Sequence, residues 1–272
     1  FRSKIKMSNS LFCVSGKNVL VTGGSRGIGY MIAKGYALAG ANVIITSRDE
    51  KACSLAADEL KCQFIPSNIA NREGCAKLVS EVNQAFNGKL HVLVNNAGAS
   101  WGEPWERESG RANWGFDKVL DLNVKGLFYV TRQCIPLLEA TASKEDPARI
   151  INIGSITGIV PQNAPTHCYD ISKAAVHQLT RKFAADLAPR KITVNALAPG
   201  FVPSRMSKGL QTWGGTEEAI AKNIPLGRMG NEDDMVGACI YFSSKAGAWC
   251  TGVILAVDGG QIGAMQIQLS NL

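Results

Sequence analysis

The fold is decided by the stretch Lys17 to Thr46, "KNVLVTGGSRGIGYMIAKGYALAGANVIIT". It begins with a short β-rich run that glycines interrupt. A segment with the apolar spacing of a helix follows, and a second β-rich run at 42–46 closes the stretch. This order of strand, helix and strand is typical of a β-α-β unit, in which the two strands run parallel.

Short apolar runs like the first recur along the rest of the chain, with helix-like segments between most of them. They are "CQFIP", "LHVLVNNAG", "ARIINIGS", "KITVNALAPG" and "GVILAVDGG". We therefore predict an α/β fold, a single doubly wound, Rossmann-type domain with a seven-stranded parallel sheet and helices on both faces. Sheets of this kind bind ligands at the carboxyl ends of their strands, near the switch point.

Length and composition favour one domain, because 272 residues at 46% hydrophobic content suffice for a large core. No linker-like tract or internal repeat divides the chain. We expect an N-terminal extension at 1–13, a tag or transit remnant, then the Rossmann-type domain at 14–262 and a tail at 263–272. The apolar runs fall short of the ~20 residues that span a bilayer, so we expect no membrane span.

The formal charge of +7 is spread along the chain and does not cluster with aromatic residues. This distribution favours an anionic small-molecule ligand and predicts no nucleic-acid binding. The eight cysteines form no C-x-x-C pair and show no metal-ligand spacing, so we expect reduced thiols, no metal and an intracellular protein. A cytoplasmic location is expected, with a mitochondrial or plastid matrix or the peroxisome as alternatives.

The glycine-rich turn at 22–29 lies between the first strand and the first helix. Glycines there allow a tight turn and let backbone N–H groups approach a pyrophosphate at the helix N-terminus. We therefore predict a nucleotide site. Its cofactor-binding residues in the turn are Gly23, Ser25, Arg26, Gly27, Ile28 and Gly29.

The second strand ends in Thr46-Ser47-Arg48, where an NAD site would place an acid on the ribose 2′-hydroxyl. That acid is missing. Arg48 and Arg26 can instead pair with a 2′-phosphate, which indicates NADP(H), with Ser47 beside them. The alternative is that both arginines are solvated surface residues. Asp49 is interpreted as the N-cap of the next helix.

Three of the five tyrosines, Tyr30, Tyr169 and Tyr241, have a lysine four residues later, the spacing of one helix face. Tyr30 lies inside the first helix and is interpreted as structural, and Tyr241 as part of a helix surface or interface. Tyr169 follows the buried strand "RIINIGS", whose carboxyl end delivers Ser155 to the ligand side of the sheet. Ser155, Tyr169 and Lys173 are therefore expected to converge.

These motifs together resemble the short-chain dehydrogenase/reductase family, from about Gly16 to Gly260. The matching motifs are the glycine-rich turn at 22–29, "NNAG" at 95–98, "LNV" around Asn123, Ser155, Tyr169 with Lys173, "NALAPG" ending at Pro199-Gly200, and "DGG" at 258–260.

The resemblance implies a nicotinamide-dependent reduction of a carbonyl, with Tyr169 protonating the oxygen and Ser155 orienting it. Lys173 would hold the nicotinamide ribose and lower the pKa of Tyr169, because an adjacent ammonium favours the phenolate. Asn123 would support a water relay, with a helix-interior hydrogen bond as the alternative.

The resemblance also assigns cofactor contacts outside the glycine-rich turn. "NNAG" would place backbone beside the adenosine ribose, unless it is only a strand-ending turn, and Asn68 stands where the family often has an acid for the adenine. The implied contacts are Asn68, Ile69, Asn95, Ala97, Gly98, Pro199, Gly200 and Val202, besides Tyr169 and Lys173.

The stretch at about 201–226 resembles the family's substrate lid. Its Met206, Leu210 and Trp213, together with Trp101, predict an apolar substrate pocket, or else residues that pack on one another. Within the family, the motifs look closest to 3-oxoacyl reductases of the rhamnolipid-pathway type, which implies reduction of a 3-oxoacyl thioester.

Two departures concern the acyl carrier protein as a partner: Ala185 stands where a basic residue is typical, and "EATASKEDPAR" replaces a shorter basic turn. Alternatives are a carbonyl reductase or alcohol dehydrogenase acting on a sugar, steroid or other small ketone, and a non-catalytic NADP-binding regulator. The segments Trp114 to Glu139 and Tyr169 to Leu187 resemble the family's interface helices, which implies a homotetramer.

Overall fold

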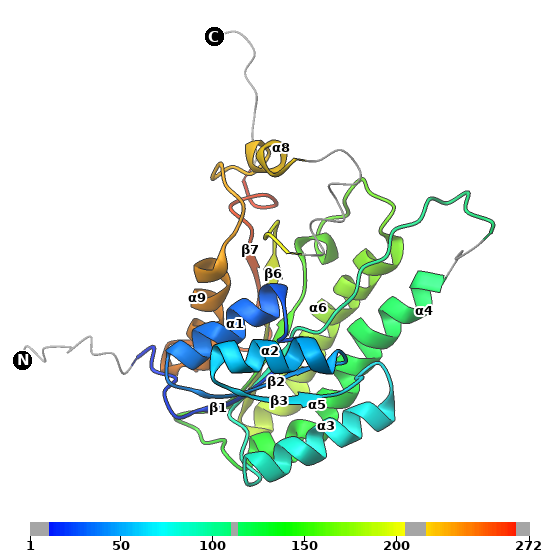
Figure 1. The fold of residues 1–272 in the computed structure, drawn as a ribbon. Coiled ribbons are helices and arrows are strands. Elements are labelled where there is room, and N and C mark those ends of the chain that lie inside the picture. Colours follow the sequence, from blue (N-terminus) through cyan, green and yellow to red (C-terminus); the bar gives the residue numbers. More distant parts are fainter. Residues whose placement is uncertain (1–10, 110–113, 205–215, 265–272) are drawn as a thin grey trace, which may run out of the picture.

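The computed structural model describes residues 11–109, 114–204 and 216–264. Its centre is a seven-stranded parallel sheet in the order β3-β2-β1-β4-β5-β6-β7 (Figure 1). The strands are β1 (Asn18–Thr22), β2 (Asn42–Ser47), β3 (Gln63–Pro66), β4 (Val92–Asn95), β5 (Ala148–Ile153), β6 (Ile192–Pro199) and β7 (Ile254–Val257). All seven predicted strands are present.

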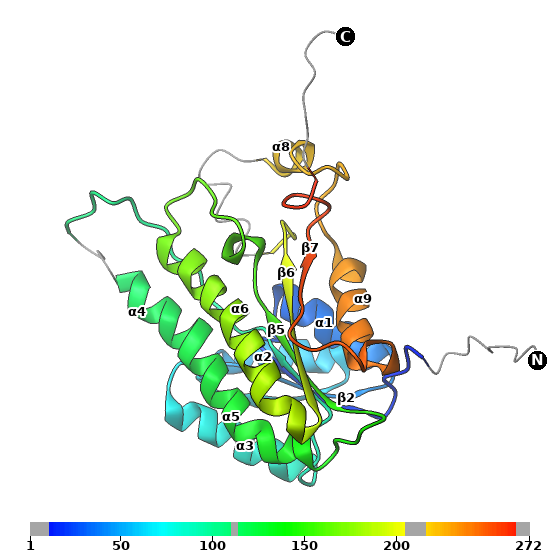
Figure 2. The same cartoon turned by 180° about the vertical axis from the view of Figure 1, so that it is seen from behind.

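Helices cover both faces of the sheet, as Figures 1 and 2 show from opposite sides. One face packs against α1 (Gly27–Leu38), α2 (Glu50–Leu60) and α9 (Glu232–Ser243). The other packs against α3 (Arg72–Ala85), α5 (Leu127–Glu139) and α6 (His167–Leu187). The helices α4 (Trp114–Leu120) and α8 (Glu217–Lys222) complete the set in the described ranges.

The central strands are mostly apolar because a parallel sheet with helices on both faces leaves neither face in water. Every residue of β5 is buried. Alternate residues enter opposite cores: Leu20 packs toward α3 and α5, whereas Val19 and Val21 pack toward α1 and α9. The predicted single, doubly wound Rossmann-type domain is thus confirmed.

The strand order places β1 between β2 and β4, so the chain changes direction across the sheet at β1 and β4. Ligands of doubly wound folds bind outside the carboxyl ends of the strands at this switch point. The glycine-rich turn after β1 and the "NNAG" stretch after β4 therefore share one edge.

Asp49 is the N-cap of α2, since its Oδ1 accepts a hydrogen bond from Ala52 N at 3.1 Å, as predicted. None of the eight cysteines forms a disulfide in this structure, and all eight lie in the described ranges. No helix within the described ranges is long and apolar enough to cross a membrane.

Candidate active site

The glycine-rich turn folds tightly over the end of β2. Gly23 and Gly24 N donate hydrogen bonds to Thr46 O at 2.8 and 3.2 Å, and Gly23 has a positive φ of 68°. No side chain caps the start of α1, whereas Asp49, Asn71 and a capping box at Asn231 cap α2, α3 and α9. The first-turn N–H groups of α1 are therefore available for an anionic group such as a pyrophosphate.

Asn96 joins this turn to the strand beside it, a role that the sequence analysis missed. Its Nδ2 donates to Thr22 O at 2.9 Å and to Gly23 O at 3.1 Å. Thr22 Oγ1 in turn accepts hydrogen bonds from Asn96 N and Ala97 N, both at 3.0 Å. The signal was present in the "NNAG" motif, but the partner of its second asparagine lies 74 residues away in the sequence.

The side chain of Asn95 points into the core. It donates to Thr131 Oγ1 and Asn152 Oδ1, both at 2.9 Å, and Asn95 is buried. This side chain therefore supports the sheet, because a strand alternates its side chains between the two faces, and the resemblance implied a cofactor contact only through the backbone of this motif. A contact through the backbone of Asn95 stays a prediction.

Two other residues predicted to contact the cofactor also have their side chains in the core. Ile69, just past β3, belongs to the apolar cluster against α3, and Val202 belongs to the cluster against α9. The predicted cofactor contacts of both residues stay predictions. Asn68 is exposed, and its Oδ1 accepts a hydrogen bond from Ala70 N at 3.3 Å.

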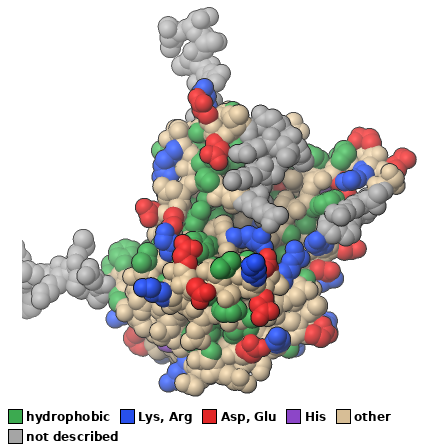
Figure 3. All heavy atoms as spheres, in the orientation of Figure 1, with side chains coloured by type: hydrophobic (Ala, Val, Ile, Leu, Met, Phe, Trp, Pro, Cys, Tyr) green, Lys and Arg blue, Asp and Glu red, His purple; other side chains and the backbone are tan. Residues whose placement is uncertain are grey.

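Arg26 and Arg48 lie at the same edge, because Thr22 of β1 is paired with Thr46 of β2. Both arginines are exposed, and neither forms an ion pair with a described residue. Ser47 Oγ donates to Asp49 O at 3.0 Å and thereby shapes the turn behind Arg48. Two unpaired guanidinium groups beside an uncapped helix start form a positive site, and Figure 3 shows several Lys and Arg side chains near the middle of the face that carries α1 and α2.

Ser155, Tyr169 and Lys173 are brought together at the carboxyl end of β5. Lys173 is buried, and its Nζ donates to Ile153 O at 2.7 Å. The same Nζ lies 5.5 Å from the centroid of the Tyr169 ring. Ser155 Oγ accepts hydrogen bonds from Thr157 N and Thr157 Oγ1 at 3.2 and 3.1 Å, which fixes its position on the loop.

The pKa values of this group differ from the expectation. Burial raises the pKa of Tyr169 to about 12, although a side-chain hydrogen bond with Ser155 acts in the opposite direction. Burial also lowers the pKa of Lys173 to about 8. Loss of hydration, the largest cause, therefore leaves the net pKa of Tyr169 raised rather than lowered in this structure, while the predicted effect of Lys173 on that pKa stays a prediction.

Asn123 lies in a π-helical turn at Asp121–Gly126, between α4 and α5. Its Oδ1 accepts from Ala99 N at 2.8 Å, and its Nδ2 donates to Ala99 O and Ser172 Oγ, both at 2.9 Å. Ser172 Oγ donates to Tyr169 O at 2.7 Å. Asn123 therefore connects the loop after β4 with the helix of Tyr169, a tertiary contact rather than the helix-interior hydrogen bond considered above.

Gly98 marks the point where the two halves of the site meet. A Cβ at Gly98 would lie 3.3 Å from Asn123 Oδ1 and 3.7 Å from Lys173 Nζ.

A Cβ at Gly27 would lie 3.5 Å from Ser204 Cβ, so the start of the predicted lid passes close to the glycine-rich turn. Pro199 ends β6, and Gly200 N donates to Val257 O at 3.1 Å.

Trp101 lies beside the first turn of α6, since its carbonyl oxygen accepts a hydrogen bond from Cys168 Sγ at 3.5 Å. Trp105 stacks on His167 at the start of the same helix, with 3.8 Å between the ring centroids. Indole surface thus lies in space beside the first turn of the helix that carries Tyr169. The other predicted pocket residues, Met206, Leu210 and Trp213, lie outside the described residues.

Known proteins resemble this chain over almost its whole length. The family model described as enoyl-(acyl carrier protein) reductase matches residues 23–261. A rhamnolipids biosynthesis 3-oxoacyl-[acyl-carrier-protein] reductase of Pseudomonas aeruginosa is 42% identical, over 92% of this chain and 97% of the relative. A 5-keto-D-gluconate 5-reductase of Escherichia coli is 32% identical, over 94% of this chain and all of the relative.

A solved structure has the same fold. The Pseudomonas aeruginosa RhlG/NADP active-site complex superposes with a TM-score of 0.87 at 41% identity, over 93% of this chain and 99% of that one. The family model, the relatives and this structure agree with the motifs and with the geometry of the site. The chain belongs to the short-chain dehydrogenase/reductase family.

Proposed function

We propose that this protein reduces the ketone of a 3-oxoacyl thioester to the 3-hydroxyacyl form with NADPH. The observation that carries the reaction type is the meeting of Ser155, Tyr169 and buried Lys173 beside the glycine-rich turn. The substrate class is supported by the 42% identical relative, a 3-oxoacyl-[acyl-carrier-protein] reductase. The RhlG/NADP complex supports the choice of nucleotide.

The residues present fit an NADP nucleotide. The uncapped start of α1 suits the pyrophosphate, and the unpaired Arg26 and Arg48 suit a 2′-phosphate. Lys173, close to Gly98 and Tyr169, would hold a ribose hydroxyl. When bound, the reduced nicotinamide supplies the hydride that the carbonyl carbon accepts.

The side chains of this chain then handle the proton. Tyr169 gives its phenolic proton to the carbonyl oxygen, so that ketone, hydride and proton together make a secondary alcohol. Ser155 donates a hydrogen bond to the same oxygen and orients it. The Lys173 ammonium stabilises the phenolate that Tyr169 becomes, and Asn123 holds the helix of Tyr169 against the loop after β4.

An apolar surface near the site favours an acyl chain over a sugar. Trp105 is 80% exposed, and Ile159 and Val160, on the segment between Ser155 and α6, are 45% and 47% exposed. Exposed apolar groups grouped beside a reactive site suit an apolar ligand. The sugar ketone remains the second candidate, supported by the 32% identical 5-keto-D-gluconate 5-reductase.

NADPH oxidation measured with 3-oxoacyl thioesters of several chain lengths and with 5-keto-D-gluconate tests the proposal. We expect kcat/KM at least tenfold higher for the best thioester. The same acyl group attached to coenzyme A and to acyl carrier protein shows which of the two carriers the enzyme prefers. Ala185, where a basic residue is typical, leaves recognition of the carrier protein open. A higher kcat/KM for the sugar would favour the second candidate, and no turnover with any ketone would favour a non-catalytic regulator.

We expect NADPH to bind more than tenfold more tightly than NADH, because charge-assisted contacts to a phosphate contribute roughly 1.5–3 kcal/mol each. Arg48→Asp should reverse this preference. Arg132→Asp, which changes an exposed arginine on α5, is the matched control and should not. Dissociation constants measured by nucleotide fluorescence provide the test, and equal affinities of the parent for both nucleotides would contradict the 2′-phosphate assignment.

We further propose a homotetramer that uses α4, α5 and α6. Phe116 on α4 and Ile171 on α6 are 43% and 53% exposed, and exposed apolar residues on neighbouring helices suit a protein interface. Light scattering at micromolar concentration should give four times the chain mass. A monomer would exclude this assembly.

A further inference from the structure

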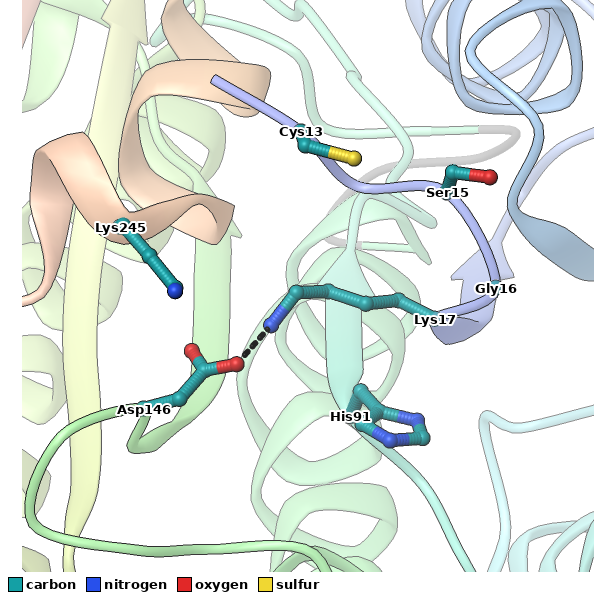
Figure 4. A pocket seen from close by; sticks show the side chains of 7 residues that line it. All are labelled: Cys13, Ser15, Gly16, Lys17, His91, Asp146 and Lys245. Atoms are coloured by element: carbon teal, nitrogen blue, oxygen red, sulfur yellow. Dashed lines mark hydrogen bonds and ion pairs between the residues drawn. The ribbon is translucent and has the colours of Figure 1, made fainter. Parts of the chain in front are cut away.

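A cavity of about 400 Å³ lies at the edge of the sheet opposite the candidate active site. Lys17 directly precedes β1, His91 directly precedes β4, and Asp146 lies two residues before β5. All strands are parallel, so these amino ends lie one strand length from the carboxyl edge, roughly 20 Å for a strand of six residues. The described lining residues are Cys13, Ser15, Gly16, Lys17, His91, Asp146 and Lys245 (Figure 4).

The cavity has an excess of positive charge. Asp146 is the one acid among the described lining residues, and two cations share it. Lys17 Nζ is 2.7 Å from Asp146 Oδ2, and Arg149 NH2 is 3.0 Å from Asp146 Oδ1. Arg149 is itself buried and also donates to the carbonyl oxygens of Phe242 and Ser244. Lys17 and Arg149 therefore already neutralise the charge of Asp146, and the charge of Lys245 is additional.

Lys245 adds a cation that has no ion-pair partner in the described ranges. It follows α9 and begins a short 3-10 turn, Lys245–Gly247, and its side chain extends toward Asp146 and Lys17 in Figure 4. An additional ammonium group in the lining of a positive cavity raises the local potential for anions.

His91 adds a neutral hydrogen-bond donor. Its Nδ1 accepts a hydrogen bond from Asn18 N at 2.9 Å, so the ring hydrogen lies on Nε2. Burial first, and then the charge of Lys17, lower the pKa of His91, which keeps the ring neutral. No described residue accepts a hydrogen bond from Nε2.

We propose that this cavity binds a small polyvalent oxyanion, inorganic phosphate or a phosphomonoester, held by the ammonium groups of Lys17 and Lys245, with His91 in the lining of the cavity. Lysine ammonium groups are compact charges that bind phosphate oxygens, and charge-assisted hydrogen bonds are the stronger kind. A volume of about 400 Å³ exceeds that of phosphate alone and leaves room for a small organic part. The site is separate from the reductase chemistry proposed above.

Histidine ring NMR tests the proposal directly, because the chain has three histidines. His91 lines the cavity, whereas His167 and His177 lie on α6 and serve as internal controls. The titration uses inorganic phosphate against sodium chloride at equal ionic strength, with a slight excess of NADP⁺ present to occupy the site at Arg26 and Arg48. We expect phosphate, but not sodium chloride, to shift the His91 signals in a saturable way. Unchanged His91 signals, or equal shifts with chloride, would overturn the proposal.

A variant pair links the binding to the cavity. Lys245→Met removes an exposed charge outside any regular helix and should weaken phosphate at least tenfold. Lys61→Met, a change at another exposed lysine without an ion-pair partner in the described ranges, at the end of α2, should leave phosphate affinity unchanged. Both variants should keep the parent's turnover of thioesters. Parent-like phosphate binding by Lys245→Met would also overturn the proposal.

Discussion

Helix α6 and the end of helix α9 carry the same tyrosine–lysine spacing in different surroundings. Tyr169 and Lys173 both lie inside α6, and Lys173 Nζ is 5.5 Å from the Tyr169 ring centroid. Tyr241 lies in α9, but that helix ends at Ser243, so Lys245 falls in the next turn. The spacing places two residues on one face only where the helix continues through both.

Burial separates the two pairs further. Lys173 is 6% exposed and lies at the carboxyl edge of the sheet, where burial lowers its pKa to about 8. Lys245 is exposed at the opposite edge, and Tyr241 Oη lies 3.2 Å from Cys250 Sγ. A reactive tyrosine–lysine pair is therefore distinguished by its place at the ligand edge of the sheet and by the burial of its lysine, rather than by the spacing of the two residues.

The largest expected difference is between the loss of the Tyr169 hydroxyl and the loss of the Tyr241 hydroxyl. Tyr169→Phe should lower kcat at least ~10²-fold with nearly unchanged NADPH affinity, because a positioned general acid contributes about that much. Tyr241→Phe is the matched control and should stay within a few-fold of the parent. Steady-state kinetics with the best ketone measure both. The comparison fails if Tyr169→Phe keeps full turnover or if Tyr241→Phe abolishes it.

The second largest difference is expected between the substitutions of the two lysines, in kcat and in NADPH affinity. Lys173→Met should lower kcat by about tenfold or more and also weaken NADPH, since the ammonium stabilises the phenolate and holds a ribose. Lys245→Met should change neither quantity. Nucleotide titration and steady-state kinetics separate the two effects. A Lys173→Met variant that binds NADPH like the parent would remove the ribose contact from the proposal.

The pH profile should report Lys173 rather than Tyr169. Tyr169 keeps its proton up to about pH 12, whereas Lys173 loses its charge as the pH rises through about 8. The rate of ketone reduction should therefore fall above about pH 8, and kcat/KM between pH 6 and 10 reports this group in the free enzyme. Lys245→Met should show the same profile. A flat profile over this range would contradict the assignment.

The third tyrosine–lysine pair, in α1, should show the smallest effect. Lys34 Nζ is 3.1 Å from Glu232 Oε2, which joins α1 to the start of α9 at a partly exposed position. Such pairs contribute ~0–1 kcal/mol, so Lys34→Met should lower the free energy of unfolding by no more than that and leave turnover unchanged. Urea denaturation measures the change, and a loss of activity would show that this pair was wrongly separated from the site.

Local sequence determined much of the fold and part of the site. The seven apolar runs predicted the seven strands, and Asp49 before Glu50 predicted the cap of α2. Both follow from residues close together in the chain, since burial on two faces and helix capping act over a few positions. The convergence of Ser155 with Tyr169 was predictable for a related reason, because in a parallel sheet the end of a strand defines the ligand edge.

Tertiary structure decided what depends on residues far apart in the sequence. The clamp of Asn96 on Thr22 spans 74 residues, and the cavity gathers Lys17, His91 and Lys245 from separate elements. The pKa of Tyr169 also depended on packing, because the hydration that a phenol loses is set by all the chain around it. A sequence lists which groups are present, whereas only the packed chain decides which of them lose water and which find a partner.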